Sequence, residues 1–310
     1  LKSEGDRRDE ADVIAMYSSV LGGITKNRKL MTVPVEDHLV HRGDGVFEAF
    51  LLEPNGIYDF DAHIDRLYRS AELIELDCGD YTKDKIAQIC FSLKKATNLE
   101  RGGFRLYLSR GPGGFGVNPY DCEKSQLYII LTSAKDSKKE KYENGVSSAF
   151  SKRVFKEPPY VWIKSCNYLA NALMKKEAVD RGLELVIARN KDGVVLEGAV
   201  ENVVIVTSDR ELWIPSFDKT LSGTTVKRAI FHAKKLIPTA LKNVCQKDFY
   251  HQDIKSAREF LAIGTTTKVL PIVRFEGENV GNGEVGPIAK QLASLIEEER
   301  AGTSCHYIFQ

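Results

Sequence analysis

A chain of 310 residues is long enough for two domains of ordinary size, each with its own hydrophobic core. Its 44 lysines and arginines nearly balance 43 aspartates and glutamates, so a net charge of +1 gives no basic stripe for nucleic acid. No apolar run approaches the roughly 18–20 residues of a membrane span. The six cysteines and six histidines lack metal-like spacing, which predicts reduced thiols, no metal site and an intracellular protein.

Residues 1–15 are charged and without periodicity, which predicts a tail that is disordered or packs on a partner. We expect the cytoplasm as its compartment. Because the chain begins without Met, an organelle after removal of a leader is the alternative. Residues 16–132 alternate strand and helix patterns, which predicts an α/β domain. The expected strands are 18–25, 46–53, 103–110 and 126–132, and the expected helices lie near 61–76 and 82–97. The polar stretch 133–149 is predicted to connect the domains.

Residues 150–310 are predicted to form a mixed, barrel-like second domain. Helices are expected near 166–181, 222–236 and 286–299, with hairpin-like strands between them. The first of these helices has an apolar stripe at Leu169, Leu173 and Ala178. Ligand sites commonly form between domains, so we expect the functional cleft there.

Lys164 lies between a Pro-Pro loop and that first helix, directly after the apolar and aromatic residues 160–163. An amine desolvated by such neighbours titrates lower and can form a Schiff base with a carbonyl cofactor. The alternative is a structural lysine whose stem lies along apolar surface.

Glu197 lies beside a glycine, between the β-branched runs 194–196 and 203–206. This position predicts a break or bulge in a buried sheet. A buried carboxylate needs a cationic or N–H partner. That partner is either a neighbouring arginine or a protonated ring nitrogen.

Two threonine-rich turns follow. Gly223-Thr224-Thr225 opens the helix 222–236, whose apolar stripe is Val226, Ala229, Ile230, Ala233 and Leu236. The second turn, Gly264 to Thr267, follows the apolar stretch 260–263. Backbone N–H groups and hydroxyls at a helix N-terminus meet the requirements of an anion site, although Ser and Thr are also ordinary helix caps. The two turns together predict a phosphate between them.

The order of these motifs resembles the fold-type IV pyridoxal-phosphate-dependent enzymes. This family includes branched-chain aminotransferases, D-amino-acid aminotransferases, (R)-amine transaminases and aminodeoxychorismate lyases. The N-terminal half adds two motifs, His-Arg-Gly-Asp-Gly-Val-Phe-Glu at 41–48 and His-Ile-Asp-Arg-Leu at 63–67. The resemblance runs from about Tyr17 to Glu299. It implies an α/β (α+β) fold of two domains, pyridoxal 5′-phosphate as cofactor, and a homodimer in which a loop of one subunit reaches the cleft of the other.

The resemblance also implies roles for individual residues. Lys164 would hold the cofactor as a Schiff base and move the proton between substrate Cα and the cofactor, and Glu197 would face the pyridine nitrogen. Tyr168 would approach the phenolate oxygen of the ring. The phosphate would be bound by Arg66, Thr224, Thr225 and Thr265, with Thr266 as a further cofactor-binding residue.

The substrate carboxylate separates the branches of this family. The Arg-x-His trap of bacterial D-amino-acid aminotransferases is absent, since Phe115 and Val117 stand at its places. Ala49 stands where the lyase branch has threonine, which disfavours the lyase. Arg42 and Arg105 are therefore the candidate partners of a substrate carboxylate. The alternative is that the stem of Arg105 packs at a subunit boundary.

Phe47 is predicted to line the substrate pocket as an apolar wall, or else to be a core aromatic on an alternating strand. These residues lead to a prediction of a pyridoxal-phosphate aminotransferase. It would transfer an amino group between a small amino acid, D-amino-acid-like or branched-chain-like, and a 2-oxo acid by a ping-pong mechanism. The alternatives are an aminodeoxychorismate lyase that releases pyruvate and a catalytically silent homologue that binds the cofactor.

Overall fold

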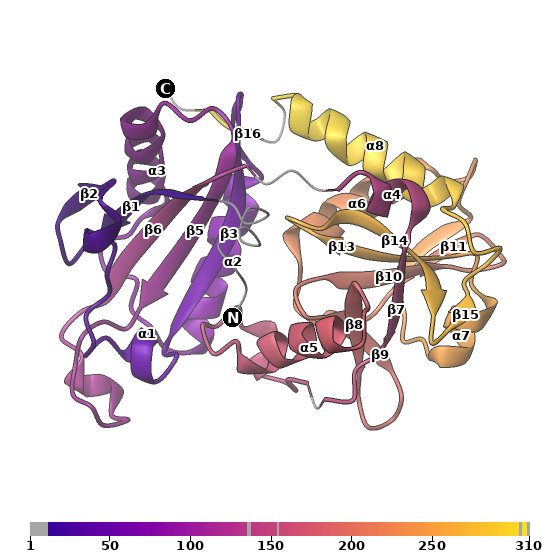
Figure 1. Ribbon diagram of the computed structural model, residues 1–310, viewed down its shortest axis with the longest axis horizontal. Coiled ribbons are helices and arrows are strands. Elements are labelled where there is room, and N and C mark those ends of the chain that lie inside the picture. Colours follow the sequence, from indigo (N-terminus) through magenta and orange to yellow (C-terminus); the bar gives the residue numbers. More distant parts are fainter. Residues whose placement is uncertain (1–11, 135–137, 154, 304–305, 309–310) are drawn as a thin grey trace. The chain divides into compact units, whose positions relative to one another are not determined.

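The computed structural model describes residues 12–134, 138–153, 155–303 and 306–308. Its contacts divide the chain into two compact units. Unit 1 comprises residues 1–137, 163–167 and 300–310, and unit 2 comprises residues 138–162 and 168–299 (Figure 1). Most of the predicted tail, residues 1–11, lies outside the described residues, and residues 13–15 belong to a strand instead.

Unit 1 contains an antiparallel sheet in the order β16-β4-β3-β5-β6-β1-β2. Its strands are β1 (Val13–Ser18), β2 (Gly23–Thr25), β3 (Gly45–Glu53), β4 (Gly56–Tyr58), β5 (Gly102–Ser109), β6 (Gln126–Ser133) and β16 (His306–Tyr307). Its helices are α1 (His38–His41), α2 (Phe60–Leu73) and α3 (Lys83–Thr97). The predicted strand 18–25 is wrong, because a turn with Gly22 at φ +68° separates β1 from β2. The other strands and helices predicted here are confirmed with shifts of a few residues at their ends.

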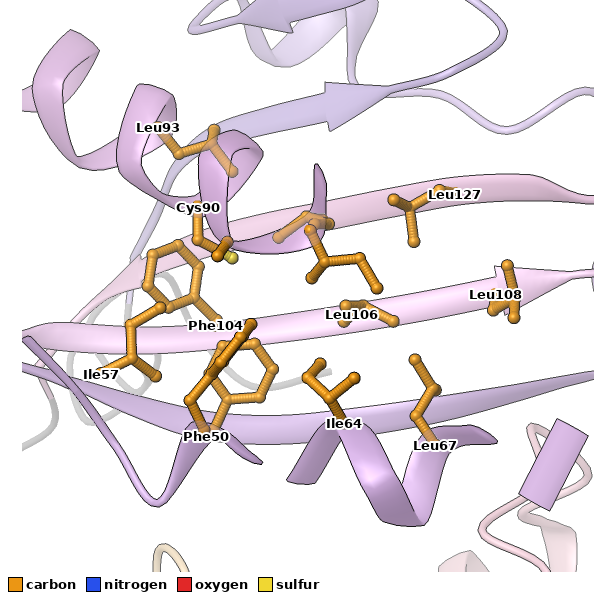
Figure 2. Packing of buried hydrophobic residues seen from close by; sticks show 14 of the residues in the cluster. Phe50, Ile57, Ile64, Leu67, Cys90, Leu93, Phe104, Leu106, Leu108 and Leu127 are labelled. Carbon is orange, nitrogen blue, oxygen red and sulfur yellow. The ribbon is translucent and has the colours of Figure 1, made fainter. Parts of the chain in front are cut away.

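Helices α2 and α3 cover one face of this sheet. Alternate residues of the strands point to that face, as period-2 alternation requires. Figure 2 shows Ile64 and Leu67 of α2, with Cys90 and Leu93 of α3, directed at the strands. The strand residues that meet them are Phe50, Phe104, Leu106, Leu108 and Leu127. This core fixes which residues of β3 and β5 face away from the helices.

Unit 2 is a mixed sheet closed into a six-stranded barrel. The ring runs β10-β13-β14-β7-β8-β9 and closes where β9 pairs again with β10. Its strands are β7 (Val146–Phe150), β8 (Leu185–Arg189), β9 (Val195–Gly198), β10 (Asn202–Val206), β13 (Glu259–Gly264) and β14 (Lys268–Phe275). β11 (Glu211–Ile214), β12 (Asn243–Gln246) and β15 (Glu278–Asn279) extend the sheet outside the ring. The predicted barrel-like domain is therefore confirmed.

The helices of unit 2 lie around this barrel (Figure 1). They are α4 (Glu140–Asn144), α5 (Leu169–Asp180), α6 (Thr224–Lys235), α7 (His251–Ser256) and α8 (Pro287–Ala301). Residues from all six ring strands share one apolar cluster. α6 and α8 bury their apolar faces in a second cluster, and α5 does so in a third. The predicted stripe of α6 is confirmed, since Val226, Ala229 and Ala233 are buried.

The predicted stripe of α5 is confirmed at Ala178 and wrong at Leu169. Leu169 is 67% exposed, and the buried residues of the helix are Asn171, Met174, Glu177 and Ala178. Glu177 can be buried because its carboxylate accepts hydrogen bonds from Ser151, Lys152 and Arg181. Polar partners, which periodicity does not detect, set the orientation of this helix.

The two units interleave along the chain more than the predicted domains do. The predicted connection 133–149 contains α4 and the start of β7, which lies inside the barrel ring. Residues 163–167 return to unit 1 because they pair with β3. No described helix has the length and apolarity that crossing a membrane demands.

Candidate active site

Lys164 is held by its main chain in unit 1. Its carbonyl accepts the Phe47 N–H at 2.9 Å, and its own N–H donates to Ser70 Oγ of α2 at 3.2 Å. The next residues continue this attachment, with a bridge between Ser165 and Val46 and a bond from Cys166 N–H to the Gly45 carbonyl. The lysine is therefore fixed at the edge of β3 by the same type of contact that pairs strands.

The side chain of Lys164 lies against an aromatic ring. Its Nζ is 4.5 Å from the centre of the Phe47 ring. Of the neighbours expected to shield it, Ile163 is buried, but Tyr160 is 69% exposed and Trp162 donates its indole N–H to the Asp218 carbonyl. The expected apolar surroundings therefore come from β3 rather than from the aromatic residues before the lysine.

Phe47 lies on the face of the sheet that α2 and α3 leave uncovered, in a row with Tyr107 and Arg105 of β5. It is paired with Tyr107 on β5, and the two rings stack with centres 6.0 Å apart. Tyr107 is hydrogen-bonded by Arg105, which lies two residues earlier on the same strand and opposite Ala49. Burial raises the pKa of Tyr107 despite the nearby guanidinium of Arg105. An amine, an aromatic wall and an exposed arginine thus follow one another in unit 1.

Arg66 is buried on α2 and paired with Glu48 of β3. The guanidinium donates from Nε to Oε1 at 2.6 Å and from Nη2 to Oε2 at 2.8 Å, a bidentate geometry. His63 Nδ1 lies 2.7 Å from the same Oε2. This carboxylate holds the arginine in one orientation.

The charges of this cluster are strongly coupled. Burial alone raises the pKa of Glu48, but Arg66 and His63 outweigh burial and hold it far below its usual range. For His63, burial lowers the pKa and outweighs the attraction of Glu48, and the charge of Lys164 lowers it further. The cluster therefore consists of a carboxylate, a guanidinium and an imidazole whose protonation is disfavoured by burial.

Arg42 holds a loop. Its guanidinium donates to the carbonyls of His41 at 2.8 Å and Gly116 at 2.9 Å, and also to the carbonyl of Phe115. These bonds attach the end of α1 to the loop after β5. Three carbonyl partners leave Arg42 less suited than Arg105 to receive a substrate carboxylate.

Glu197 is a buried residue of β9 in unit 2. Its Oε2 accepts the Leu221 N–H at 3.0 Å and the Asn202 side-chain N–H at 3.3 Å. The pairing of β8 with β9 is irregular beside it, since Ile187 pairs with Gly198 but Arg189 pairs with Val195. The predicted bulge and the predicted N–H partners are both present.

The two threonine turns meet at the N-terminus of α6. Thr225 Oγ1 lies 3.1 Å from Thr265 Oγ1, across 40 residues of sequence. The N-cap residue of α6 is Gly223, so no side chain at that position covers the first turn. Thr224 and Thr225 are both buried.

Two further predicted residues, Tyr168 and Thr266, belong to unit 2. Tyr168 precedes α5, and Lys156 Nζ is 4.7 Å from the centre of its ring. Thr266 is exposed, whereas the next residue, Thr267, donates its hydroxyl to Glu201 at 3.1 Å. Thr266 is therefore less suited to a cofactor contact than Thr265.

The donor set of unit 2 fits a phosphate-bearing heterocycle. Hydroxyls and N–H groups at a helix N-terminus suit a phosphate dianion. A buried carboxylate held by neutral donors suits a protonated ring nitrogen. In unit 1, a lysine beside an aromatic ring suits covalent capture of an aldehyde. Among the described residues, no group of three or more His, Cys, Asp or Glu side chains could hold a metal ion.

These features fit an enzyme that binds a phosphate-bearing aldehyde cofactor. The profile of the family described as amino-transferase class IV matches residues 45–275. A D-amino-acid transaminase, chloroplastic, of Arabidopsis thaliana is 36% identical over 292 residues, which are 93% of this chain and 77% of the relative. The chain therefore belongs to the class IV aminotransferases, whose cofactor is pyridoxal 5′-phosphate.

Solved structures agree with this assignment. The branched-chain amino acid aminotransferase of Escherichia coli superposes with a TM-score of 0.84 at 25% identity, over 93% of this chain and 94% of that chain. A hypothetical aminotransferase of Mycobacterium tuberculosis, in its PLP-bound form, gives a TM-score of 0.77 at 22% identity, over 92% of this chain and 98% of that chain. The predicted two-domain fold of type IV is confirmed.

Glu48 and Asn202 belong to these clusters but were not among the predicted site residues. Glu48 is fully buried although it carries a charge, and Asn202 contacts Glu197. The sequence did contain a signal for Glu48. It alternates with Val46 and Phe50 on the face of the strand that points into the core. No comparable local signal marks Asn202, because its partners are chosen by strand register.

Proposed function

We propose that this chain is a pyridoxal 5′-phosphate-dependent aminotransferase that moves an amino group between a small D-amino acid and a 2-oxo acid in two half-reactions. The single observation that carries the proposal is the meeting of Thr225 and Thr265 at an N-terminus of α6 capped by glycine. The D-enantiomer is favoured because the relative that is 36% identical is named a D-amino-acid transaminase.

The bound cofactor supplies an electron sink for the bond that breaks at the substrate Cα. Lys164 is the amine that holds the cofactor aldehyde, and once released it carries the proton to and from Cα. Its main-chain bonds to Phe47 and Ser70 fix the position of the Cα from which the amine extends. Glu197 faces the ring nitrogen and favours its protonated form.

The phosphate is held by Thr224, Thr225 and Thr265 together with Arg66. The bidentate bond to Glu48 fixes the direction in which the Arg66 guanidinium points. Charge-assisted bonds from such a rigid fork are stronger than those of a mobile lysine. Tyr168 is proposed to approach the ring oxygen of the cofactor.

Arg105 is the proposed partner of the substrate carboxylate. It is exposed on β5 and is linked through Tyr107 to Phe47, the ring that Lys164 touches. Phe47 serves as the apolar wall for the substrate side chain. Arg42 is assigned to the loop after β5 rather than to substrate, because its guanidinium already binds carbonyls of that loop.

We further propose a homodimer that works in the cytoplasm or in an organelle. The loop after β5 carries exposed apolar side chains, Phe115, Val117 and Tyr120, as a surface covered by a second subunit would. Light scattering on the purified chain should give twice the mass of 34.7 kDa. A mass of one chain would refute the dimer without touching the chemistry.

The proposed activity is tested with a donor panel read through the absorbance of the cofactor. The panel contains D- and L-alanine, D- and L-glutamate, D- and L-leucine and (R)-phenylethylamine, each followed by a 2-oxo acid. We expect D-alanine or D-glutamate to convert the bound cofactor and a 2-oxo acid to restore it. Preference for L-leucine would favour the branched-chain reaction, and response to no donor would contradict the aminotransferase.

The lyase alternative has a different product. An aminodeoxychorismate lyase releases pyruvate without needing a 2-oxo acid acceptor. Pyruvate formed from aminodeoxychorismate in the absence of acceptor would replace the proposed reaction by that one. If the absorbance band of the bound cofactor changes with none of the donors and not with aminodeoxychorismate, the chain is a catalytically silent homologue.

A further inference from the structure

Asn202 occupies the position where the barrel of unit 2 closes. It is the first residue of β10 and is only 9% exposed. On one side it pairs with Glu197 of β9, and on the other with Ile263 of β13. Ile263 is followed directly by the turn that carries Thr265. The asparagine is therefore adjacent to two of the segments to which cofactor contacts are assigned.

The side chain of Asn202 binds the third segment. Its Nδ2 donates to the Leu221 carbonyl at 2.8 Å and to Glu197 Oε2 at 3.3 Å. The Leu221 N–H donates to the same Oε2 at 3.0 Å. Carboxylate, amide and peptide thus close a triangle of hydrogen bonds, and both partners of Nδ2 are acceptors.

The oxygen of the Asn202 amide limits which residue can stand at position 223. A Cβ placed on Gly223 would lie 2.0 Å from Asn202 Oδ1, far inside contact distance. Only glycine permits this approach. Gly223 is the N-cap of α6, directly before Thr224 and Thr225. The position of the helix N-terminus is therefore defined against the Asn202 amide.

We propose that Asn202 is a positioning residue for the cofactor, and this rests on the function proposed above. It fixes the rotation of the Glu197 carboxylate through Oε2. Through Leu221 and Gly223 it also sets where the N-terminus of α6 begins. The Asn202 amide therefore fixes the position of the Glu197 carboxylate, proposed to face the ring nitrogen, relative to the N-terminus of α6, proposed to bind the phosphate.

The sharpest variant is Asn202→Asp, which keeps the size and replaces the donor by an acceptor. The new oxygen would face Glu197 Oε2 and the Leu221 carbonyl, so both hydrogen bonds become repulsive contacts. We expect the dissociation constant of pyridoxal 5′-phosphate, measured by titrating the apoprotein, to rise at least about tenfold. We also expect the absorbance spectrum of the bound cofactor to shift toward that of Glu197→Gln.

Two further variants separate positioning from folding. Asn190→Asp makes the same chemical change in a turn where the side chain acts as an acceptor for Asp192 and Val194 N–H groups, so affinity and spectrum should not change. Asn202→Ser keeps a small donor and removes the repulsion, so it should recover part of the lost affinity. It also serves if the Asp variant does not fold.

The outcomes are distinct. If Asn202→Asp or Asn202→Ser lowers only the melting temperature of the apoprotein, while cofactor affinity and spectrum match the wild type, Asn202 merely closes the barrel and the inference is overturned. The proposed function stands in that case if Glu197→Gln still alters the spectrum. If the wild type binds no pyridoxal 5′-phosphate, the proposed function and this inference fail together.

Discussion

The two units each bury a glutamate, but they hold it with different chemistry. Glu48 of unit 1 binds a guanidinium in bidentate geometry and an imidazole nitrogen at 2.7 Å. Glu197 of unit 2 is held at Oε2 by an amide and a peptide N–H, both neutral. A carboxylate paired with an arginine mainly supports structure and orients that arginine. For Glu197, which accepts these two N–H groups, we propose instead that it faces a cation that arrives with the cofactor.

Removing the first carboxylate should have the largest effect. Glu48→Ala leaves the Arg66 charge buried without its partner, which costs about 3–5 kcal/mol of the free energy of unfolding. Urea unfolding of the apoprotein measures it. As a control, Glu100→Ala removes an exposed partner of Lys94 and should change stability by less than about 0.5 kcal/mol. A loss below about 1 kcal/mol for Glu48→Ala would mean that the pair is not structural.

Removing the charge of the second carboxylate should act on catalysis instead. Glu197→Gln keeps the size of the side chain but no longer favours a protonated ring nitrogen. We expect cofactor to remain bound and the half-reaction with D-alanine to slow on the order of 100-fold. Glu177→Gln, a buried glutamate of the same unit, should lower stability and leave the rate nearly unchanged. Equal rates for Glu197→Gln and the wild type would remove the distinction between the two carboxylates.

The phosphate contacts should show a smaller effect. Thr225→Val deletes the hydroxyl that lies 3.1 Å from Thr265 and should weaken cofactor binding about tenfold. Thr225→Ser should recover most of this affinity. Thr207→Val, whose hydroxyl accepts the Glu211 N–H, provides the control for losing one hydrogen bond elsewhere in unit 2. If the Thr207 and Thr225 variants bind cofactor equally well, α6 does not hold the phosphate.

The smallest effect is a pH dependence of stability in unit 1. The pKa of His63 is lowered from 6.5 by burial, so the unfolded chain binds its proton first on acidification. The stabilisation is complete above about pH 6.5 and is lost as pH falls toward the folded value. Glu48, whose pKa is also lowered, adds a second loss below about pH 4.5. His63→Asn should flatten the pH dependence of the unfolding free energy just below pH 6.5, and an unchanged slope there would contradict the assignment.

Features that depend on neighbouring residues in sequence could be predicted from the sequence. The bulge at Glu197 follows from a glycine between β-branched runs, and the start of α6 follows from Gly223 and its threonines. The apolar stripe of α6 follows from its 3.6-residue period. Each of these was found where the sequence placed it.

Features that depend on register or on polar pairing could not be predicted. Glu177 turns α5 because Ser151 and Arg181 provide its partners, and neither belongs to that helix's apolar pattern. The aromatic neighbour of Lys164 is Phe47, which lies 117 positions earlier in the sequence. Pairing with β3 brings the two residues together. Asn202 acquires its role only when β9 and β10 pair.

The most direct test of the whole account is to locate the lysine that carries the cofactor. Protein loaded with pyridoxal 5′-phosphate is reduced with borohydride, which makes the attachment permanent, and is then digested and examined by mass spectrometry. We predict the cofactor mass on the peptide that contains Lys164 and its absence from Lys164→Ala. Cofactor mass on another lysine, or on none, would contradict it.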